Sequence, residues 1–402
     1  MELRSCTYAT VTTLGDFGPW ISKVVLDLPC TVRANDLDAN TFHIYVERHE
    51  RTGEVLMRKE RGADHAAPSV GYIDVLAAYP CDENGRKLAV GTHVALEVAE
   101  QRLTKKIEGG VMGSRMLDDQ LHVTQLAALP GNDGDGPTCR GDICSALKGW
   151  SNAVQKTAVD GIALEYGFFE PSFKAEDSAC FNPFAPEATV VPQKAPLVVY
   201  LHGAGEGKGA TQGEGATRAY IGNRVTAISQ AQIQRYFGGF AWVLVPQSPT
   251  FWMDNGVEQL GRSNQSIYSP VLKALIDEFI AEHAGRIDTD RIVVAGLSNG
   301  GFMTLRLCAD YPDFFAAGLP CCAPWYNTTD EDVAALAKTP LWFTHSKGDE
   351  LVSPQQTVLP LTARLRDAGA NVHLTYFSHV EDLTGRYREA DGSPKKTFNH
   401  GV

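Results

Sequence analysis

One stretch of the chain, residues 291–307, constrains the fold more than any other. It opens with the apolar run 292–295, Ile-Val-Val-Ala, which is typical of a strand buried on both faces of a sheet. The chain then turns through residues 296–300, Gly-Leu-Ser-Asn-Gly, and from Phe302 onward apolar residues recur at helical spacing. A buried strand, a sharp turn and a helix in direct succession predict an α/β protein with a parallel sheet.

The turn itself predicts a nucleophile at Ser298. A serine held in a tight strand-to-helix turn leaves no room for side chains two positions before and after it, and Gly296 and Gly300 occupy those positions. Gly301 would let the helix pack close to the sheet. The hydroxyl would then stand at a helix N-terminus, where developing negative charge is stabilised. The alternative is a turn with a structural role only, and the flanking strand and helix favour the catalytic interpretation.

The second part of the chain alternates strands with helices. This alternation predicts a mostly parallel sheet covered on both faces, with its chemistry at the carboxyl ends of the strands. We therefore predict an α/β-hydrolase fold over residues 156–402. The expected strands are residues 162–169, 197–201, 241–245, 292–295, 317–319 and 340–344, and the expected helices include residues 269–283 and 332–337.

Residues 1–130 have a different pattern, in which short strands are separated by turn signals. Residues 21–28 and 41–47 are rich in β-branched and aromatic residues, and residues 93–98 alternate between apolar and polar. Several such strands in this length predict a small immunoglobulin-like β-sandwich, which we interpret as a spacer or stabilising module. The Gly/Asp-rich start of residues 131–155 predicts a linker between the domains.

Composition excludes several classes of function. The net charge is −12 and no Lys/Arg cluster is present, which argues against a nucleic-acid partner. No apolar run is long enough for a membrane span, and no Cys/His spacing suits a metal. The first residues carry no apolar leader, so we expect a cytoplasmic protein, or a secreted one whose leader has been removed.

The chain has nine cysteines. Cys139 and Cys144 could pair, and Cys308, Cys321 and Cys322 are expected to be buried thiols.

The loop after the strand at 197–201 predicts an oxyanion hole. Its sequence, Leu-His-Gly-Ala-Gly over residues 201–205, contains a His-Gly pair, and a glycine there allows the backbone to turn an amide inward. We expect the backbone amides of Ala204 and Asn299 to hold the oxyanion. His202 is interpreted as a structural residue of this loop. The Gly-rich segment that follows lacks the Lys-Ser/Thr of a phosphate-binding loop.

The remaining members of a catalytic triad should follow Ser298 in the order acid, then histidine. Asp349 comes shortly after the strand at 340–344 and is the predicted acid. Two histidines could be the base. His379 directly follows an expected strand at 372–377, whereas His400 lies beyond a segment, 383–397, that could form an inserted hairpin. The pattern alone leaves this choice open.

From about residue 195 the chain resembles a family of bacterial α/β-hydrolase esterases related to the prolyl-oligopeptidase and polyhydroxybutyrate-depolymerase-like clans. Members of that family carry an immunoglobulin-like N-terminal domain. The resemblance implies that His400 is the base, although Asn399 stands where the family usually has glycine, and a short closing segment with an aromatic residue is expected after Val402. The motifs that carry it are Leu201-His-Gly-Ala-Gly-Glu206, Val245-Pro-Gln-Ser-Pro-Thr-Phe-Trp-Met-Asp254, Ser298-Asn-Gly-Gly301, Trp342-Phe-Thr-His-Ser-Lys-Gly-Asp349, Asp382-Leu-Thr-Gly and Asn399-His-Gly401.

The same resemblance implies a serine carboxylesterase that needs no cofactor and acts on a small-molecule or polymer-linked ester. It also implies that Gly203, Trp252 and Trp325 line the substrate pocket, with core packing as the alternative for the two tryptophans. A serine peptidase of prolyl-oligopeptidase type is the main rival, but residues 1–130 show no propeller period. Polyester or feruloyl esterase activity is also compatible with the motifs, whereas the intact nucleophile turn disfavours a non-catalytic carbohydrate-binding protein. The oligomeric state cannot be predicted from the sequence.

Overall fold

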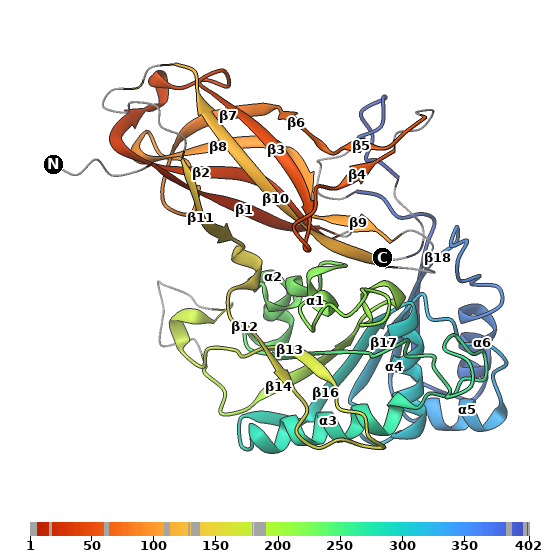
Figure 1. Ribbon diagram of the computed structural model, residues 1–402. Coiled ribbons are helices and arrows are strands. Elements are labelled where there is room, and N and C mark those ends of the chain that lie inside the picture. Colours follow the sequence, from red (N-terminus) through yellow and green to blue (C-terminus); the bar gives the residue numbers. More distant parts are fainter. Residues whose placement is uncertain are drawn as a thin grey trace. The chain divides into compact units, whose positions relative to one another are not determined.

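The computed structural model describes residues 6–15, 18–59, 64–107, 113–127, 129, 137–178, 180, 190–382, 388–396 and 400. The chain forms two compact units (Figure 1). The first takes most of the residues up to 148, and the second takes most of the residues from 149 onward.

The N-terminal unit is a β-sandwich of two sheets. One sheet has the strand order β11-β1-β2-β8-β7 and the other has the order β6-β3-β10-β9, and every pairing is antiparallel except that of β1 with β11. In β3, Phe42, Ile44 and Val46 are buried, while the residues between them are more exposed. This alternation of buried and exposed residues, with a repeat of two, determines which face of the strand packs in the core. The strands are β1 (Thr7–Gly15), β2 (Gly18–Arg33), β3 (Phe42–Glu50), β4 (Met57–Arg58), β5 (Ala67–Pro68), β6 (Val70–Ile73), β7 (Val75–Cys81), β8 (Val90–Arg102), β9 (Thr104–Lys106), β10 (Ser114–Gln125) and β11 (Thr138–Ile143).

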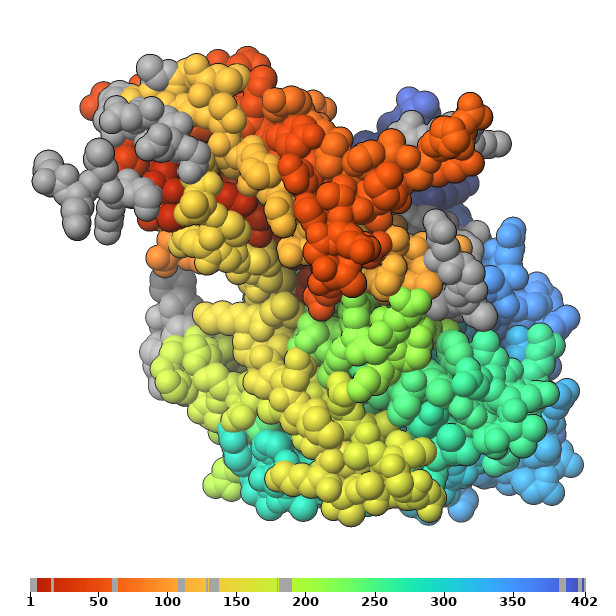
Figure 2. Space-filling view, viewed as in Figure 1, coloured from red at the N-terminus to blue at the C-terminus, as the bar shows by residue number. Residues whose placement is uncertain are grey.

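The segment 131–155, which the sequence predicts to be a linker, contains two strands among its described residues. β11 belongs to the sandwich, where Thr10 and Thr12 donate side-chain hydrogen bonds to Asp142 of β11. β12 (Trp150–Val154) instead forms one edge of the eight-stranded sheet of the second unit, and its largely exposed residues lie in the yellow surface of Figure 2. Both are exposed edge strands with few buried apolar residues, which is why composition alone marks the segment as a linker.

The second unit is an α/β domain built on an eight-stranded sheet of order β12-β13-β15-β14-β16-β17-β18-β19. Its strands from β15 to β19 pair in parallel, and β13 and β12 extend one edge in the antiparallel sense. This confirms the predicted mostly parallel sheet of an α/β-hydrolase. The remaining strands are β13 (Glu165–Phe169), β14 (Ala195–Leu201), β15 (Trp242–Gln247), β16 (Ile287–Leu297), β17 (Ala317–Cys321), β18 (Leu341–Ser346) and β19 (Val372–Phe377).

Helices and central strands of this unit share one core. Val199 of β14, Val294 of β16 and Phe343 of β18 are buried in it, as expected for strands covered on both faces. The helix α4 packs against β14, β16 and β17. Among the described residues no helix is both long and apolar enough to cross a membrane. The helices are α1 (Arg218–Ile221), α2 (Ala231–Gln234), α3 (Tyr268–Glu282), α4 (Asn299–Asp310), α5 (Asp330–Leu336) and α6 (Val358–Asp367).

Candidate active site

Ser298 lies in a strained turn between β16 and α4. Its backbone angles are φ 56° and ψ −115°, outside the regions that a residue with a side chain usually adopts. Such a conformation costs on the order of 1–3 kcal/mol and persists only where neighbouring structure holds it. Here the Ser298 N–H donates to the carbonyl of Cys321 at 2.8 Å, and the Ser298 carbonyl accepts from Phe302 N–H at 2.9 Å.

The glycines around the turn are required by close backbone approach. A Cβ atom on Gly300 would collide with the carbonyl of Leu201, and one on Gly296 would collide with the carbonyl of Gly300. A Cβ on Gly301 would lie 2.5 Å from the Cys321 carbonyl oxygen. The turn is therefore packed directly against the end of β14 and the end of β17, as the Gly-x-Ser-x-Gly pattern predicts.

The predicted oxyanion loop follows β14 and lies beside this turn. Ala204 is buried at the start of a short 3-10 helix, Ala204–Glu206, and Asn299 is the first residue of α4. The position of a Cβ on Gly203 is 3.7 Å from the carbonyl oxygen of Leu297, immediately before Ser298. The Asn299 side chain accepts a hydrogen bond from the Trp252 backbone N–H at 2.5 Å, which fixes the N-terminus of the helix.

His202 is a buried structural residue of the loop, as the sequence indicates. Its Nε2 accepts a hydrogen bond from the Ser248 backbone N–H at 3.0 Å, and its Nδ1 lies 2.6 Å from the Gly203 carbonyl oxygen. One nitrogen thus acts as acceptor and the other as donor, which is the neutral imidazole. Burial lowers the pKa of His202 from 6.5 to about 4.

This pKa leads to an expected pH dependence of stability. Between pH 6.5 and about 4 the unfolded chain binds a proton at residue 202 that the folded protein does not bind. The free energy of unfolding should therefore decrease as the pH falls through this window, by roughly 3 kcal/mol from this residue. Urea unfolding of the wild type and of His202→Gln, at pH 7 and at pH 4.5, measures the effect. An equal decrease in the two proteins would show that His202 is not responsible.

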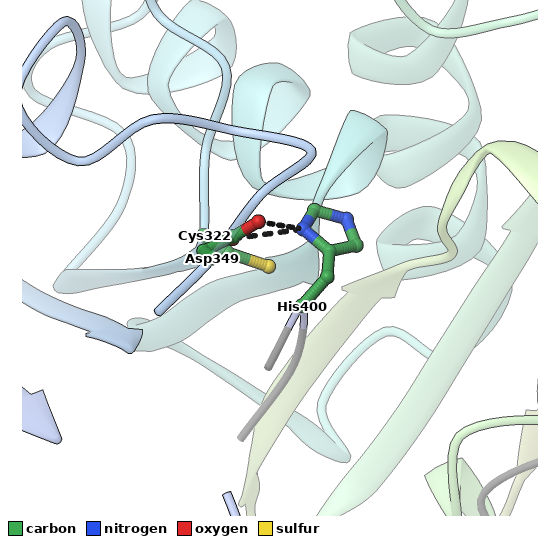
Figure 3. Close-up of side chains that lie close together, drawn as sticks. All are labelled: Cys322, Asp349 and His400. Atoms are coloured by element: carbon green, nitrogen blue, oxygen red, sulfur yellow. Dashed lines mark hydrogen bonds and ion pairs between the residues drawn. The ribbon is translucent and has the colours of Figure 1, made fainter. Parts of the chain in front are cut away.

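Asp349 and His400 form a hydrogen-bonded pair (Figure 3). The Nδ1 atom of His400 lies 2.9 Å and 3.1 Å from the two carboxylate oxygens of Asp349. Backbone N–H groups of Leu351 and Val352 also donate to this carboxylate, at 3.0 Å and 2.9 Å. Burial disfavours the charged form, but hydrogen bonds from His345 and His400 outweigh it and hold the pKa of Asp349 well below its usual range.

The sequence interpretation missed the role of His345. This histidine of β18 is fully buried, and its Nε2 lies 3.1 Å from Oδ2 of Asp349 and 2.9 Å from the carbonyl oxygen of Val352. Because the Val352 carbonyl can only accept, Nε2 carries the proton and donates. His345 therefore holds the carboxylate in addition to His400. The available signal was the four-residue spacing of His345 and Asp349 across the end of an expected strand.

The other histidine considered from the sequence, His379, does not contact Asp349. Its Nε2 lies 3.1 Å from a carboxylate oxygen of Glu381, and its Nδ1 lies 3.0 Å from the hydroxyl of Ser378. The described residues between His379 and His400 include the antiparallel bridges Glu381 to Lys396 and Arg388 to Pro394, which agree with the inserted hairpin expected there. Residues 383–387 and 397 of that predicted hairpin lie outside the described part of the chain.

Trp252 and Trp325 are core residues, which differs from their expected place in the wall of a substrate pocket. Both side chains are essentially inaccessible. The Trp252 ring packs against His202 and Tyr268, with ring centroids 5.1 Å and 5.8 Å apart, and Trp325 packs against Phe302 at 5.6 Å. The sequence motifs show only that each tryptophan follows the end of a strand. The direction of its side chain depends on packing between segments that are distant in sequence, so the motifs could not predict it. Their placement favours a role in supporting the oxyanion loop and the helix behind Ser298.

All nine cysteines are free thiols, so Cys139 and Cys144 do not pair. Cys308 and Cys322 are buried, as expected, and Cys321 is partly buried.

Cys322 lies in the candidate site, which the sequence did not indicate. It has a left-handed backbone with φ 36°, and its side chain lies beside Asp349 and His400 (Figure 3).

Comparison with known proteins agrees with this geometry. Residues 7–136 match the esterase Ig-like N-terminal domain, and residues 252–334 match the prolyl oligopeptidase family. The chain is 27% identical over 169 residues to "Putative esterase NocK" of Nocardia uniformis subsp. tsuyamanensis, covering 42% of this chain and 44% of that protein. It is 30% identical over 154 residues to poly(3-hydroxyalkanoate) depolymerase C of Paucimonas lemoignei, covering 36% and 32%. The chain thus spans less than half the length of these curated relatives.

The fold of the chain is that of a solved esterase. The crystal structure of a thermostable esterase aligns with 93% of this chain and 91% of its own, with a TM-score of 0.70 and 21% sequence identity. Fold and matches together define an α/β-hydrolase with an immunoglobulin-like N-terminal domain. Over parts of its length the chain is similar to a bacterial esterase and a bacterial depolymerase, which confirms the resemblance inferred from its motifs.

Proposed function

We propose that the protein is a serine carboxylesterase in which Ser298 is the nucleophile, His400 the base and Asp349 the acid of the triad. The observation that carries the proposal is the pair formed by His400 Nδ1 and the Asp349 carboxylate, 2.9 Å apart. A neutral histidine whose Nδ1 donates to a buried carboxylate carries the lone pair that accepts a proton on its Nε2. The strained turn of Ser298 supplies the matching hydroxyl at the edge of the sheet where Asp349 lies.

The reaction proceeds through an acyl-enzyme. His400 takes the proton of the Ser298 hydroxyl as its oxygen attacks the ester carbonyl carbon, and the backbone amides of Ala204 and Asn299 stabilise the resulting oxyanion. The alcohol leaves with the proton held by His400. Water then attacks the acyl-enzyme by the same route and regenerates the serine. Asp349 stabilises the imidazolium in both halves of the reaction.

Two observations favour an ester over a peptide as substrate. The N-terminal unit matches an esterase domain and is a β-sandwich, whereas a propeller would show four-stranded blades repeated around a channel. The curated relatives are named as a putative esterase and a poly(3-hydroxyalkanoate) depolymerase. The match to the prolyl oligopeptidase family keeps a peptidase as the second candidate.

Substrate assays separate the esterase from the peptidase. The substrates are p-nitrophenyl acetate, a series of longer acyl and feruloyl esters, and a peptidyl anilide. Turnover of the anilide alone would contradict the proposal.

Replacement of Asp349 by asparagine should lower kcat by about four orders of magnitude. Asparagine keeps the shape of the side chain but can donate its amide to His400, which favours the wrong tautomer and removes the charge that stabilises the imidazolium. Glu350→Gln is the matched control, because this neighbouring carboxylate is exposed and should be replaceable without loss. Steady-state hydrolysis of p-nitrophenyl acetate measures both variants, and equal activities would remove Asp349 from the triad.

A further inference from the structure

Three potential metal ligands converge at the proposed triad, two of them members of it. The sulfur of Cys322, a carboxylate oxygen of Asp349 and a ring nitrogen of His400 all lie within 4.8 Å of one another. The sulfur lies beside the carboxylate, on the side of the imidazole ring that carries Nδ1 (Figure 3). Cys322 and Asp349 are buried, and His400 is partly buried.

We propose that Cys322, Asp349 and His400 form a binding site for a thiophilic divalent cation such as Zn²⁺ or Cd²⁺. One sulfur, one nitrogen and one oxygen are the ligand types that zinc takes in proteins, and three protein ligands leave a fourth position for water. Around a tetrahedral zinc these atoms stand about 3.3–3.8 Å apart, given bond lengths of about 2.0–2.3 Å. The observed separations therefore require movements of about 1 Å.

The backbone holds the sulfur in this position. Cys322 has a left-handed φ of 36°, and its N–H donates to the carbonyl of Thr344 at 2.8 Å. The preceding residue, Cys321, accepts the hydrogen bond from the Ser298 N–H. These two bonds attach the Cys321–Cys322 backbone to the end of β16 and to β18, and the Cys322 sulfur lies within 4.8 Å of the Asp349 and His400 ligand atoms.

Charge balance also favours a divalent cation. Binding replaces the proton on the Cys322 sulfur with the metal and releases that proton to solvent, with no change in oxidation state. The thiolate and the Asp349 carboxylate then carry two negative charges, which a divalent cation neutralises. A buried site without net charge avoids the desolvation cost of an unpaired ion. Soft cations have an additional preference for the sulfur.

Metal binding at this site should inhibit the enzyme, and this consequence rests on the proposed function. A cation on Nδ1 of His400 displaces the proton that Nδ1 donates to Asp349. The neutral ring then carries its proton on Nε2, which can no longer accept the proton of Ser298. Zn²⁺ and Cd²⁺ are thus expected to act as reversible inhibitors of ester hydrolysis.

Titration of the 402-residue chain with Cd²⁺ tests the site directly. One equivalent should produce the ultraviolet charge-transfer band of a cadmium–thiolate bond, with matching heat in calorimetry and release by EDTA. Cys322→Ser should remove the band and weaken binding by about tenfold or more. Cys321→Ser is the matched control, because the adjacent thiol is not among the converging ligands and its variant should retain both signals. A band that persists in Cys322→Ser, or that is absent from the wild type, would overturn the proposal.

Two further measurements separate this inference from the proposed function. Ser298→Ala keeps all three ligands, so it should bind Cd²⁺ with the same band whether or not Ser298 is the nucleophile. Binding without inhibition of the wild type would support the metal site and contradict the catalytic roles of Asp349 and His400. If Cys322→Ser does not fold, His400→Ala replaces it, since loss of the nitrogen ligand should also weaken Cd²⁺ binding by about tenfold or more. Unchanged affinity in His400→Ala would count against the site.

Discussion

Replacing Ser298 by alanine should abolish ester hydrolysis while leaving both units folded. The hydroxyl oxygen is the atom that forms the acyl-enzyme, so its removal should lower kcat by about four to six orders of magnitude. Alanine is smaller than serine and has the same backbone preferences, so the hydrogen bonds to Cys321 and Phe302 should hold it in the same strained conformation. The backbone amides of Ala204 and Asn299 remain in the variant, so a small residual rate over water is expected.

Hydrolysis of p-nitrophenyl acetate and circular-dichroism melting measure this effect on activity and fold. Ser353→Ala is a suitable control, because Ser353 lies in the loop after Asp349 and contacts Gln355 rather than the proposed site. Its activity and melting temperature should match those of the wild type. If Ser298→Ala kept more than about a tenth of the wild-type kcat, another residue would have to be the nucleophile.

His400→Ala should lower kcat nearly as much as Ser298→Ala does. His379→Ala should change kcat by only a few fold. Loss of the proposed base removes the group that would accept the Ser298 proton, which costs about four to six orders of magnitude in kcat when triad members act as a unit. His379 makes its hydrogen bonds to Ser378 and Glu381 instead. The two variants therefore form a matched pair of histidine deletions, one in the proposed triad and one near it in sequence.

The double variant Ser298→Ala/His400→Ala provides a further check. Because the two residues act in one step, it should be no slower than either single variant. Additive losses would mean that His400 acts in a different step from Ser298. A large loss in His379→Ala with a small loss in His400→Ala would assign the base to His379 and contradict the proposal.

Local patterns in the sequence were sufficient to predict the strand-turn-helix around Ser298. The two glycines, the apolar run before them and the helical spacing after them act over about fifteen residues, and the structure places each element there. The alternation of strands and helices also predicted the parallel sheet, because strands buried on both faces have continuous apolar runs. The linker at 131–155 was different, since its two edge strands have few buried side chains to mark them.

The amino-acid sequence by itself therefore determined the fold class, the position of Ser298 and the candidacy of Asp349, because each depends on the spacing of nearby residues. Tertiary structure decided which histidine meets Asp349, since His400 lies 51 residues away along the chain and reaches the carboxylate only after a hairpin has been inserted. It also decided that Trp252 and Trp325 face the core and that Cys322 faces the proposed triad. The physical reason is the same in each case: the direction of a side chain at a strand end is fixed by packing and hydrogen bonds to segments distant in sequence.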